Sequence, residues 1–347
     1  MEGPVPSATS EAVELTIVIV NWNGGEKLLR CLSSIRASRT TFPVKVIVVD
    51  NDSWDGSREL AAAEFPEFLV LNTGANLGFG RGNNFARPFV NTPLVLFLNP
   101  DTELFPATLE KAVRSLLGKP RVGILGCQMH DPDGRVQKLN PEWFPTPGRI
   151  FLELVLACLT LTGLGKDGLP RQDPCRSSLV NRVSGCFLLA RKDVLDEVGW
   201  FDDRYFMYAE EVDLCRTVQE RGWGIYYEAD CAIIHQRGGC TENVPSEFSV
   251  LMQQRSTNLM IAKYQGRLGA ILHRLAVGVA ASMRLVGLGI LQLAMRSLGR
   301  GDRVLDKAWR RSWLLWQWAW LKREAEIPKP RRGAIDEAVE MKSPEAK

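Results

Sequence analysis

Several common functional motifs are missing from this 347-residue sequence. It has no GxxxxGK[ST] phosphate loop, and the glycines at 78, 80 and 82 lack the GxGxxG spacing of a dinucleotide site, which disfavours an NAD-dependent oxidoreductase. None of the eight cysteines belongs to a Cys-x-x-Cys pair, and several lie inside apolar runs. We therefore interpret the cysteines as small buried hydrophobic residues.

An excess of charge of one sign is also missing. The net charge of +3 is too weak to indicate a nucleic-acid partner, and the hydrophobic and charged fractions of 45% and 24% are typical of a globular protein. The N-terminus has no basic segment leading into an apolar one, so we expect no secretory signal and a reducing, cytoplasmic location. Disordered tails are expected only at 1–13 and 327–347.

Apolar runs alternate with helical stretches in the first third of the chain. The runs are rich in Val, Ile, Leu and Phe, as is typical of strands buried on both faces of a parallel sheet; they lie at 15–20, 44–49, 68–71 and 94–98. Helices are expected at 26–37, 56–64, 82–90 and 106–117. The alternation predicts an α/β fold, with a mostly parallel, Rossmann-like sheet flanked by helices.

Polar side chains follow each expected strand. They are Asn21 and Asn23, then Asp50 and Asn51, then the run 72–76, then Asn99 and Asp101. In open α/β sheets, ligands bind at the carboxyl ends of the strands, so this edge is the expected ligand site.

Asp50 ends the second apolar run, and a sharp turn follows near Gly56. Its carboxylate could accept the ring N–H of uracil or thymine; taken alone, a capping role in the turn is the better interpretation. The glycine- and asparagine-rich run 76–84 suits a phosphate through backbone donors beside a helix N-terminus, or is an ordinary connection. Its candidate binding residues are Asn76, Gly78, Gly82 and Asn83.

Asp101 is expected at the tip of an exposed turn after the fourth strand, where Pro100 fixes the preceding backbone. Mg²⁺ or Mn²⁺ commonly uses one or two protein carboxylates and takes its other ligands from diphosphate oxygens and water. Asp101 is therefore the candidate metal ligand, with Asn99 beside it, although Asn-Pro-Asp is also a common turn.

A second block of the chain, 183–234, contains an acidic cluster. Glu210, Glu211 and Asp213 stand at the start of an expected helix, where acids often only complement the helix dipole. One of them, with its pKa raised by its acidic neighbours, could instead take a proton from an acceptor hydroxyl. His235 is expected in a polar loop as a phosphate or metal contact, and Arg237 as a phosphate contact or a solvated charge.

The C-terminal third differs from the rest of the chain. The charges at 263–323 are largely Lys and Arg, and an apolar stretch at 275–295 holds a single charge, Arg284. Nine Leu, Ile and Val residues contribute about −3 to −5 kcal/mol to membrane insertion, against roughly +2.5 to +3.5 for the arginine, so insertion is near break-even. We expect 246–326 to be helical and to lie on a membrane surface; a spanning helix, or helices packed on the catalytic domain, are the alternatives. A shorter apolar stretch at 150–164 is interpreted as a lid or a membrane-facing flap.

Taken together, these motifs resemble the family 2 glycosyltransferases of the GT-A fold, and most closely the branch with bacterial rhamnosyltransferases. The resemblance covers about 14–242 and is carried by 17–23, 48–57, 76–84, 97–102, 185–191 and 201–222. It implies a domain at 14–245, with a donor half at about 14–130 and an acceptor half at about 180–245. It also implies that Asp50 contacts the nucleobase, Asp101 contacts the metal and diphosphate, and a carboxylate of the Glu pair is the base of an inverting transfer.

The sequence departs from the family pattern in two motifs, and Arg81 also stands at a position that looks small in relatives. Asn99 fills the first place of the metal motif Asp-x-Asp, and Glu211 stands where the family usually has the Asp of a Glu-Asp pair. We expect Glu211 to be the base. The expected function is sugar transfer to a glycan or lipid-diphosphate-linked acceptor at the inner face of the plasma membrane, with dTDP-L-rhamnose as the candidate donor. The alternatives are a UDP-hexose donor, or a nucleotide-sugar-binding protein without catalysis.

Overall fold

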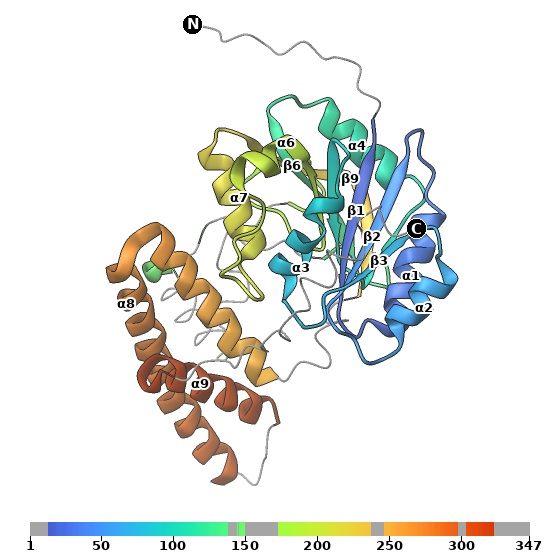
Figure 1. Cartoon of the computed structure of the whole chain (residues 1–347). Coiled ribbons are helices and arrows are strands. Elements are labelled where there is room, and N and C mark those ends of the chain that lie inside the picture. The colour runs from blue at the N-terminus through green and yellow to red at the C-terminus, as the bar shows by residue number, and fades with distance from the viewer. Residues whose placement is uncertain are drawn as a thin grey trace, which may run out of the picture.

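The computed structural model describes residues 13–137, 144, 146–149, 173–236, 246–297 and 303–322 (Figure 1). Residues 1–12 of the expected N-terminal tail, the expected C-terminal tail at 327–347, the apolar segment 150–164 and Arg237 lie outside these residues.

The described residues form a mixed sheet flanked by helices, followed by a helical appendage. The strands are β1 (Leu15–Asn21), β2 (Val44–Asp50), β3 (Leu69–Asn72), β4 (Leu94–Leu98), β5 (Thr102–Leu104), β6 (Val122–His130), β7 (Ser178–Val180), β8 (Phe187–Arg191) and β9 (Gly224–His235). The helices are α1 (Gly25–Arg36), α2 (Ser57–Glu64), α3 (Phe79–Phe85), the short 3-10 helix η1 (Arg87–Phe89), α4 (Thr108–Leu117), α6 (Lys192–Val198), α7 (Glu210–Glu220), α8 (Ser246–Ser297) and α9 (Arg303–Leu321).

Across the described sheet, the strand order is β3-β2-β1-β4-β8-β6-β9-β5, and β7 pairs with β9. The first four strands in this order are parallel, whereas β8 runs antiparallel to both β4 and β6. This gives the mostly parallel half that the sequence predicts, joined to a mixed half that carries the acidic cluster.

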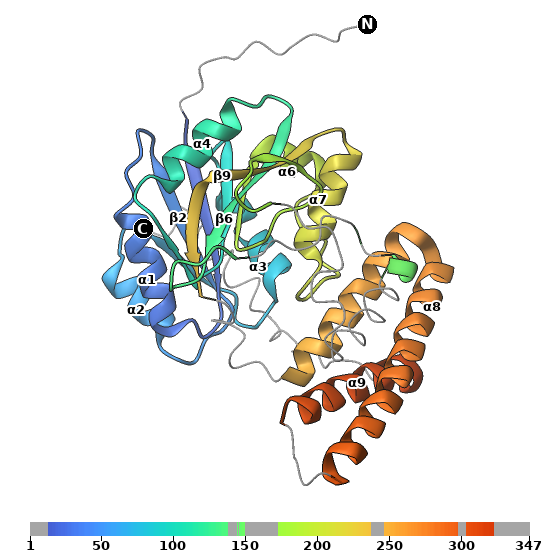
Figure 2. The same ribbon diagram turned by 180° about the vertical axis from the view of Figure 1, so that it is seen from behind.

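Helices cover both faces of the sheet (Figures 1 and 2). One hydrophobic core holds the inward residues of α1, α2 and α4, and a second core on the opposite face holds those of α6 and α7. All seven residues of β1 are buried, which explains why its sequence is apolar without alternation.

The expected helix at 82–90 is wrong in its bounds. The helix α3 begins at Phe79 and ends at Phe85, and η1 follows it. Its Gly- and Asn-rich sequence has low intrinsic helix propensity, so tertiary contacts form this helix. Asn84 supplies them: its amide donates to Phe201 O at 2.7 Å, and its Oδ1 accepts from Phe201 N at 3.1 Å.

The appendage consists of α8 and α9. Helix α8 reverses direction at Gly266, whose φ of 71° lies in the left-handed region that favours glycine. Its two limbs, 246–265 and 267–297, lie beside each other, with Asn258 Oδ1 3.0 Å from His273 Nδ1. Helix α9 packs against the second limb, where the Trp320 ring leaves no room for a side chain at Gly278.

Candidate active site

The strand register brings the predicted polar residues to one edge of the sheet. Asn21, the last residue of β1, pairs with Asp50 at the end of β2, and Asp50 pairs with Asn72 at the end of β3. Asn21, Asp50 and the adjoining Asn51 are all buried. The first part of the expected ligand edge is therefore a packed polar layer below the surface.

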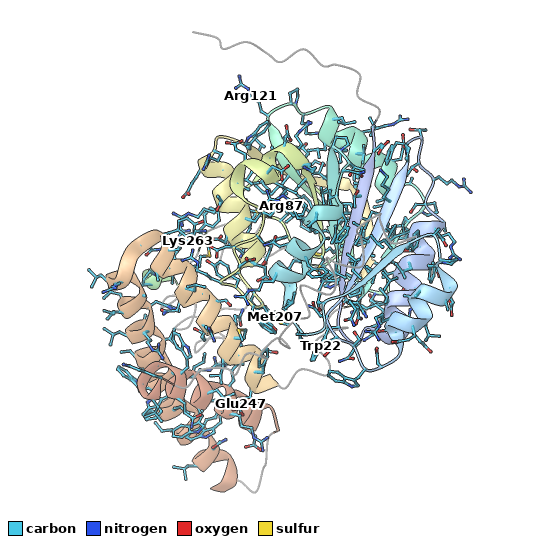
Figure 3. All side chains as sticks on the ribbon, in the orientation of Figure 1. Trp22, Arg87, Arg121, Met207, Glu247 and Lys263 are labelled. Atoms are coloured by element: carbon cyan, nitrogen blue, oxygen red, sulfur yellow. The ribbon has the colours of Figure 1, made fainter. Side chains whose placement is uncertain are left out.

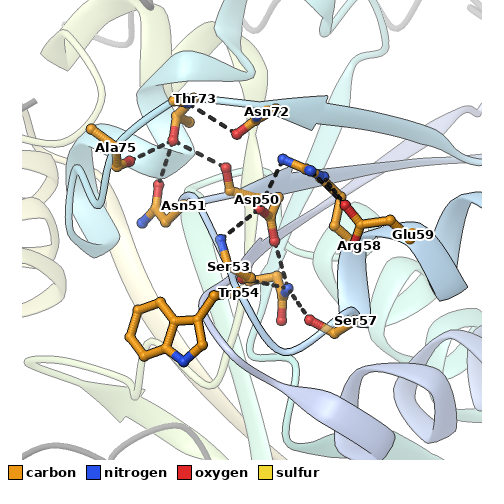
Figure 4. A network of polar contacts seen from close by, with 12 residues as sticks. Asp50, Asn51, Ser53, Trp54, Ser57, Arg58, Glu59, Asn72, Thr73 and Ala75 are labelled. Carbon is orange, nitrogen blue, oxygen red and sulfur yellow. Dashed lines mark hydrogen bonds and ion pairs between the residues drawn. The ribbon is translucent and has the colours of Figure 1, made fainter. Parts of the chain in front are cut away.

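Both carboxylate oxygens of Asp50 have partners within the chain (Figure 4). Oδ1 accepts from Asn21 Nδ2 at 2.7 Å, and Oδ2 accepts from the backbone N–H of Ser53 at 2.9 Å. The Arg58 guanidinium lies 4.0 Å from Oδ2. Asp50 is fully buried, so in this structure it holds the end of β1 against the turn after β2. A direct contact with a base stays a prediction.

The rings of Trp22 and Trp54 and the side chain of Asn23 adjoin this buried layer. The Trp22 and Trp54 rings meet edge to face with centroids 5.4 Å apart, and Trp54 is 73% exposed. Asn23 has a φ of 53°, and its Oδ1 accepts from Trp54 N at 2.9 Å. Its buried Nδ2 has no hydrogen-bond partner among the described residues. An amide donor left over beside an exposed aromatic ring suits a polar, planar ligand.

The segment between β3 and α3 is fixed by Asn51. The Nδ2 of Asn51 donates to Gly78 O at 3.0 Å and lies 3.4 Å from Asn76 Oδ1, which also accepts from Gly78 N at 3.0 Å. A Cβ at Gly78 would lie 2.0 Å from Phe206 O. Gly78 is therefore required for close packing against the segment before α7.

Gly82 and Asn83 lie in the middle of α3 and not at the helix N-terminus expected for this run. A Cβ at Gly82 would lie 2.8 Å from the Val20 side chain, so this glycine allows the helix to approach β1. Asn83 Nδ2 donates to Phe79 O at 3.0 Å, while its buried Oδ1 has no partner among the described residues.

Asp101 and His235 meet, although 134 residues separate them in the sequence. Strand β5 pairs antiparallel with β9 and sets Thr102 opposite His235. Asp101 Oδ1 lies 3.7 Å from His235 Nε2. Two expectations are corrected here: Asp101 is only 5% exposed, because β9 covers its turn, and His235 ends a strand.

Gln137 orients the His235 ring. Its Oε1 lies 3.2 Å from His235 Nδ1, and its Nε2 donates to His235 O at 2.8 Å and to Asp131 Oδ1 at 2.9 Å. Because these bonds use the amide hydrogens of Gln137, its Oε1 is the acceptor and His235 Nδ1 carries the proton. In this tautomer the Nε2 lone pair faces Asp101.

These residues fit a divalent cation. The 3.7 Å between Asp101 Oδ1 and His235 Nε2 is less than twice an ordinary metal–ligand distance of about 2.1 Å, so one ion can touch both atoms. The described residues contain no group of three or more His, Cys, Asp and Glu side chains arranged to hold a metal. The remaining ligands would come from diphosphate and water, as Mg²⁺ commonly accepts.

Cys186 lies beside this pair. Its Sγ is 3.3 Å from His235 Nε2 and accepts from Asn99 Nδ2 at 3.5 Å. Burial raises the pKa of Cys186 to about 12, and the charges of Asp101 and Glu211 contribute in the same direction. Cys186 is thus a neutral thiol at physiological pH, and it lies between the candidate metal ligand and the acidic cluster.

The three acidic residues at the start of α7 have different surroundings. A Cβ at Gly185 would lie 3.6 Å from Glu211 Cβ, which places Glu211 against the Gly185–Cys186 segment next to Asp101. Burial raises the pKa of Glu211, although the charge of Arg182 opposes it. Glu210 lies instead 3.7 Å from a Cβ built at Gly80, and its buried Oε2 has no partner among the described residues. Burial, and then the charge of Glu211, raise the pKa of Glu210 as well.

Asp213 does not join this pair. Its Oδ2 accepts from Lys263 Nζ at 2.7 Å, and its Oδ1 accepts from Tyr205 OH at 3.2 Å. To act as a base, Asp213 would have to give up a buried ion pair, so we assign it a positioning role. Sequence reasoning missed three of these residues: Gln137 and Lys263 lie in no motif, and Cys186 was interpreted only as a small buried hydrophobic residue.

Comparisons with known proteins identify the family of this chain. The model of the family described as "Glycosyl transferase family 2" matches residues 16–199. The chain is 30% identical over 266 residues to the N-acetylglucosaminyl-diphospho-decaprenol L-rhamnosyltransferase of Mycobacterium tuberculosis, covering 72% of this chain and 84% of that protein. It is 25% identical over 226 residues to the rhamnosyltransferase WbbL of Escherichia coli K12, covering 63% and 82% of the two chains.

A solved structure has the same fold. The mannosyltransferase PcManGT from Pyrobaculum calidifontis, in complex with GDP-Man and Mn²⁺, superposes with a TM-score of 0.56 at 16% identity, covering 93% of this chain and 92% of that one. The chain therefore belongs to glycosyl transferase family 2 and is a nucleotide-sugar glycosyltransferase with the GT-A fold.

Proposed function

We propose that this enzyme transfers L-rhamnose, with inversion, from a nucleotide-diphospho-sugar to a lipid-diphosphate-linked acceptor. The observation that carries the chemistry is the convergence of Asp101, His235 and Glu211 around Cys186. The choice of sugar and acceptor is supported by the two bacterial relatives, which are named as rhamnosyltransferases, one of them acting on a decaprenol-linked sugar.

The chain's own groups supply the proton transfer. The Glu211 carboxylate takes the proton of the acceptor hydroxyl as the hydroxyl oxygen forms a bond to the anomeric carbon. The bond from that carbon to the diphosphate oxygen breaks, and its electron pair leaves with the nucleoside diphosphate. A raised pKa suits Glu211 to this role because it makes the carboxylate a stronger base at neutral pH.

Asp101 and His235 would hold a Mg²⁺ or Mn²⁺ ion at the diphosphate. Such an ion, when bound, stabilises negative charge on the departing oxygen. Asn23 Nδ2 and Asn83 Oδ1 are buried polar atoms with no partner among the described residues, and they are available for hydrogen bonds to the donor. The exposed Trp54 ring could pack against the nucleobase.

The second limb of α8 supports attachment to a membrane surface. Large apolar side chains between 42% and 70% exposed recur every three or four residues along its outer face. This apolar stripe consists of Leu268, Leu272, Leu275, Val279, Met283, Val286, Ile290 and Leu293. Its neighbours on the appendage include exposed arginines at 267, 310 and 311 and exposed tryptophans at 313 and 320. Apolar, aromatic and cationic groups in this combination fit an anionic lipid surface.

The exposure of the stripe also helps to decide between attachment to the membrane surface and its two alternatives, a spanning helix and helices packed on the catalytic domain. Helix α8 contains an 18-residue window with a mean hydropathy of 1.6, so its length and composition would allow it to cross a bilayer. However, Val277 and Ala281 on the inner face of the same limb belong to a core that also holds Leu251 and Met252 of the first limb, residues of α9, and Phe206 before α7. A helix with one face packed in this core and the other exposed suits a position in the plane of the membrane.

The function is tested by assaying sugar transfer with dTDP-L-rhamnose, UDP-hexoses and GDP-mannose, with Mg²⁺ or Mn²⁺, onto a polyprenyl-diphosphate-linked GlcNAc. We expect turnover with dTDP-L-rhamnose, and loss of turnover in Asp101→Ala and Glu211→Gln. Preferred use of a UDP-hexose would replace the donor assignment. Metal-dependent binding of a nucleotide sugar without transfer or hydrolysis would instead indicate a binding protein.

Membrane attachment is tested by co-sedimentation with vesicles of phosphatidylglycerol and phosphatidylcholine. The double variant Val286→Glu/Ile290→Glu should reduce the fraction of protein bound to vesicles, because both side chains are 65% exposed and the change adds charge only at the stripe. Leu60→Glu, at a 47% exposed position on α2, is the matched control. Equal binding of all three proteins would contradict the assignment of the stripe to the membrane.

A further inference from the structure

The segment 199–209, which leads into α7, is held in an unfavourable backbone conformation. Three of its non-glycine residues have positive φ angles: Trp200 at 65°, Tyr208 at 68° and Ala209 at 68°. Such conformations are costly for residues with a side chain and persist only where the surrounding structure enforces them. The residue that follows Ala209 is Glu210, so whatever enforces this segment also sets the start of the catalytic helix.

One side of the segment is held by the donor half of the enzyme. Phe79 N donates to Phe206 O at 3.0 Å, and Gly78 has no room for a side chain at the same contact. The Asn84 side chain binds Phe201 O and, at 2.8 Å, Asp203 Oδ1.

The other side is held by the first limb of α8 (Figure 3). Ser256 Oγ donates to Met207 O at 2.7 Å. The Phe206 side chain belongs to the appendage core together with Leu251 and Met252. Tyr205 packs in the same way with Met260. The segment is therefore enclosed between the donor half and the appendage.

Lys263 joins the two ends of this segment. Its Nζ lies 2.7 Å from Asp213 Oδ2, in the first turns of α7, and 3.1 Å from Asp202 Oδ2, at the start of the segment. The Asp213 side chain is 3% exposed, so its polar partners come from the chain and not from water, and Lys263 is the cationic one. Partial burial acts to lower the pKa of Lys263, but the hydrogen bond and charge of Asp213 outweigh it and raise the pKa. Lys263 is therefore a cation at physiological pH.

We propose that Lys263 is a positioning residue for the transfer reaction, holding Glu211 in place through Asp213. Asp213 is two residues from Glu211 on the same helix, and its N–H makes the first bond of that helix, to Ala209 O at 2.8 Å. Without the ammonium group, the buried Asp213 carboxylate moves toward water and the first turn of α7 moves with it. The appendage is thus a structural part of the active site. The proposal rests on the proposed function for the identity of the base.

The test compares Lys263→Met, Lys263→Arg and Lys45→Met in the full-length enzyme. Lys45 is the matched control, because it forms a 3.1 Å ion pair with Glu14 at the opposite end of the sheet. A displacement of about 1 Å in a catalytic group lowers the rate by roughly 100-fold, so Lys263→Met should lower kcat by about 10- to 100-fold. The KM for the nucleotide sugar should stay within about twofold, because the base does not bind the donor. Lys263→Arg should restore most of kcat, and Lys45→Met should behave as wild type.

Hydrogen exchange provides a readout that does not need turnover. Amides at 202–213 should exchange faster in Lys263→Met than in wild type and in Lys45→Met. If wild type turns over no nucleotide sugar, the proposed function fails, while the exchange data still test the restraint. A kcat of Lys263→Met within twofold of wild type, or equal loss in Lys263→Met and Lys263→Arg, would overturn the proposal. If Lys263→Met does not fold, Ser256→Ala takes its place with the same readouts and limits.

Discussion

The buried carboxylate of Asp50 allows a sharp choice between two roles. As a direct base contact, Asp50 would matter for nucleotide binding and little for stability. The structure instead gives it hydrogen bonds to Asn21 and Ser53 N, at 2.7 and 2.9 Å. Hydrogen bonds to a charged group contribute about 1.5–3 kcal/mol each. Asp50→Asn keeps one acceptor but turns an amide toward the other donor, so it should cost roughly 1.5–3 kcal/mol.

This cost can be measured as a change in Tm. For domains of 150–250 residues, 1 kcal/mol corresponds to about 2–4 °C of Tm, and this slope falls as the chain becomes longer. At about 2 °C per kcal/mol, Asp50→Asn should lower the Tm of this chain by roughly 3–6 °C. Asp50→Ala, which removes both acceptors, should lose about twice as much. Asp133→Asn is the control, since Asp133 lies on an exposed turn and should change stability by no more than about 0.5 kcal/mol.

The assay is thermal unfolding, paired with calorimetric titration of dTDP and UDP at low temperature. If Asp50→Asn unfolds within 1 °C of wild type but binds nucleotide at least tenfold more weakly, our reasoning is refuted. Asp50 would then turn toward the base in the loaded enzyme.

Three further predictions concern the groups around the metal site and the base. Gln137→Met should weaken Mn²⁺ binding by about 10- to 100-fold, measured by electron paramagnetic resonance, because His235 loses the acceptor that fixes its tautomer; unchanged affinity would contradict this. Burial raises the pKa of Glu210, so the stability it contributes is present below its ordinary pKa and is lost as pH rises through the raised value. Glu210→Gln keeps the neutral form and should therefore have a higher Tm than wild type at pH 7.5, with the difference shrinking toward pH 5; a lower Tm at pH 7.5 would show that the charge is stabilised. Burial likewise raises the pKa of Glu211, so kcat should begin to fall, as pH is lowered, above the ordinary value for Glu of about 4.3; a kcat that falls only at or below this ordinary value would contradict the raised pKa of Glu211 as the base.

Parts of this fold follow from local sequence alone. Strands β1 and β4 are buried throughout and β2 over most of its length, so their apolar runs identify them within one or two residues. Helix α3 was placed wrongly because its Gly- and Asn-rich sequence depends on contacts with Phe201, more than 100 residues away. Local propensity carries no information about such contacts.

The site, like the fold, could be predicted from the sequence only in part. Asp50 and Asp101 could be identified as residues at strand ends, but the burial of both depends on neighbours that only the folded chain provides. His235 reaches Asp101 through the pairing of β5 with β9, which no spacing in the sequence reveals. The role of Asp213 depends on Lys263, a residue in a different region of the chain.

The two faces of the second limb of α8 are under different constraints. Val277 and Ala281 on the inner face belong to the core that encloses Phe206, whereas the side chains of the apolar stripe are 42% to 70% exposed. Under the proposed attachment, substitutions on the outer face would change membrane binding and leave the core of the inner face intact. A single helix would then allow the lipid preference of the enzyme and the packing behind its active site to change independently.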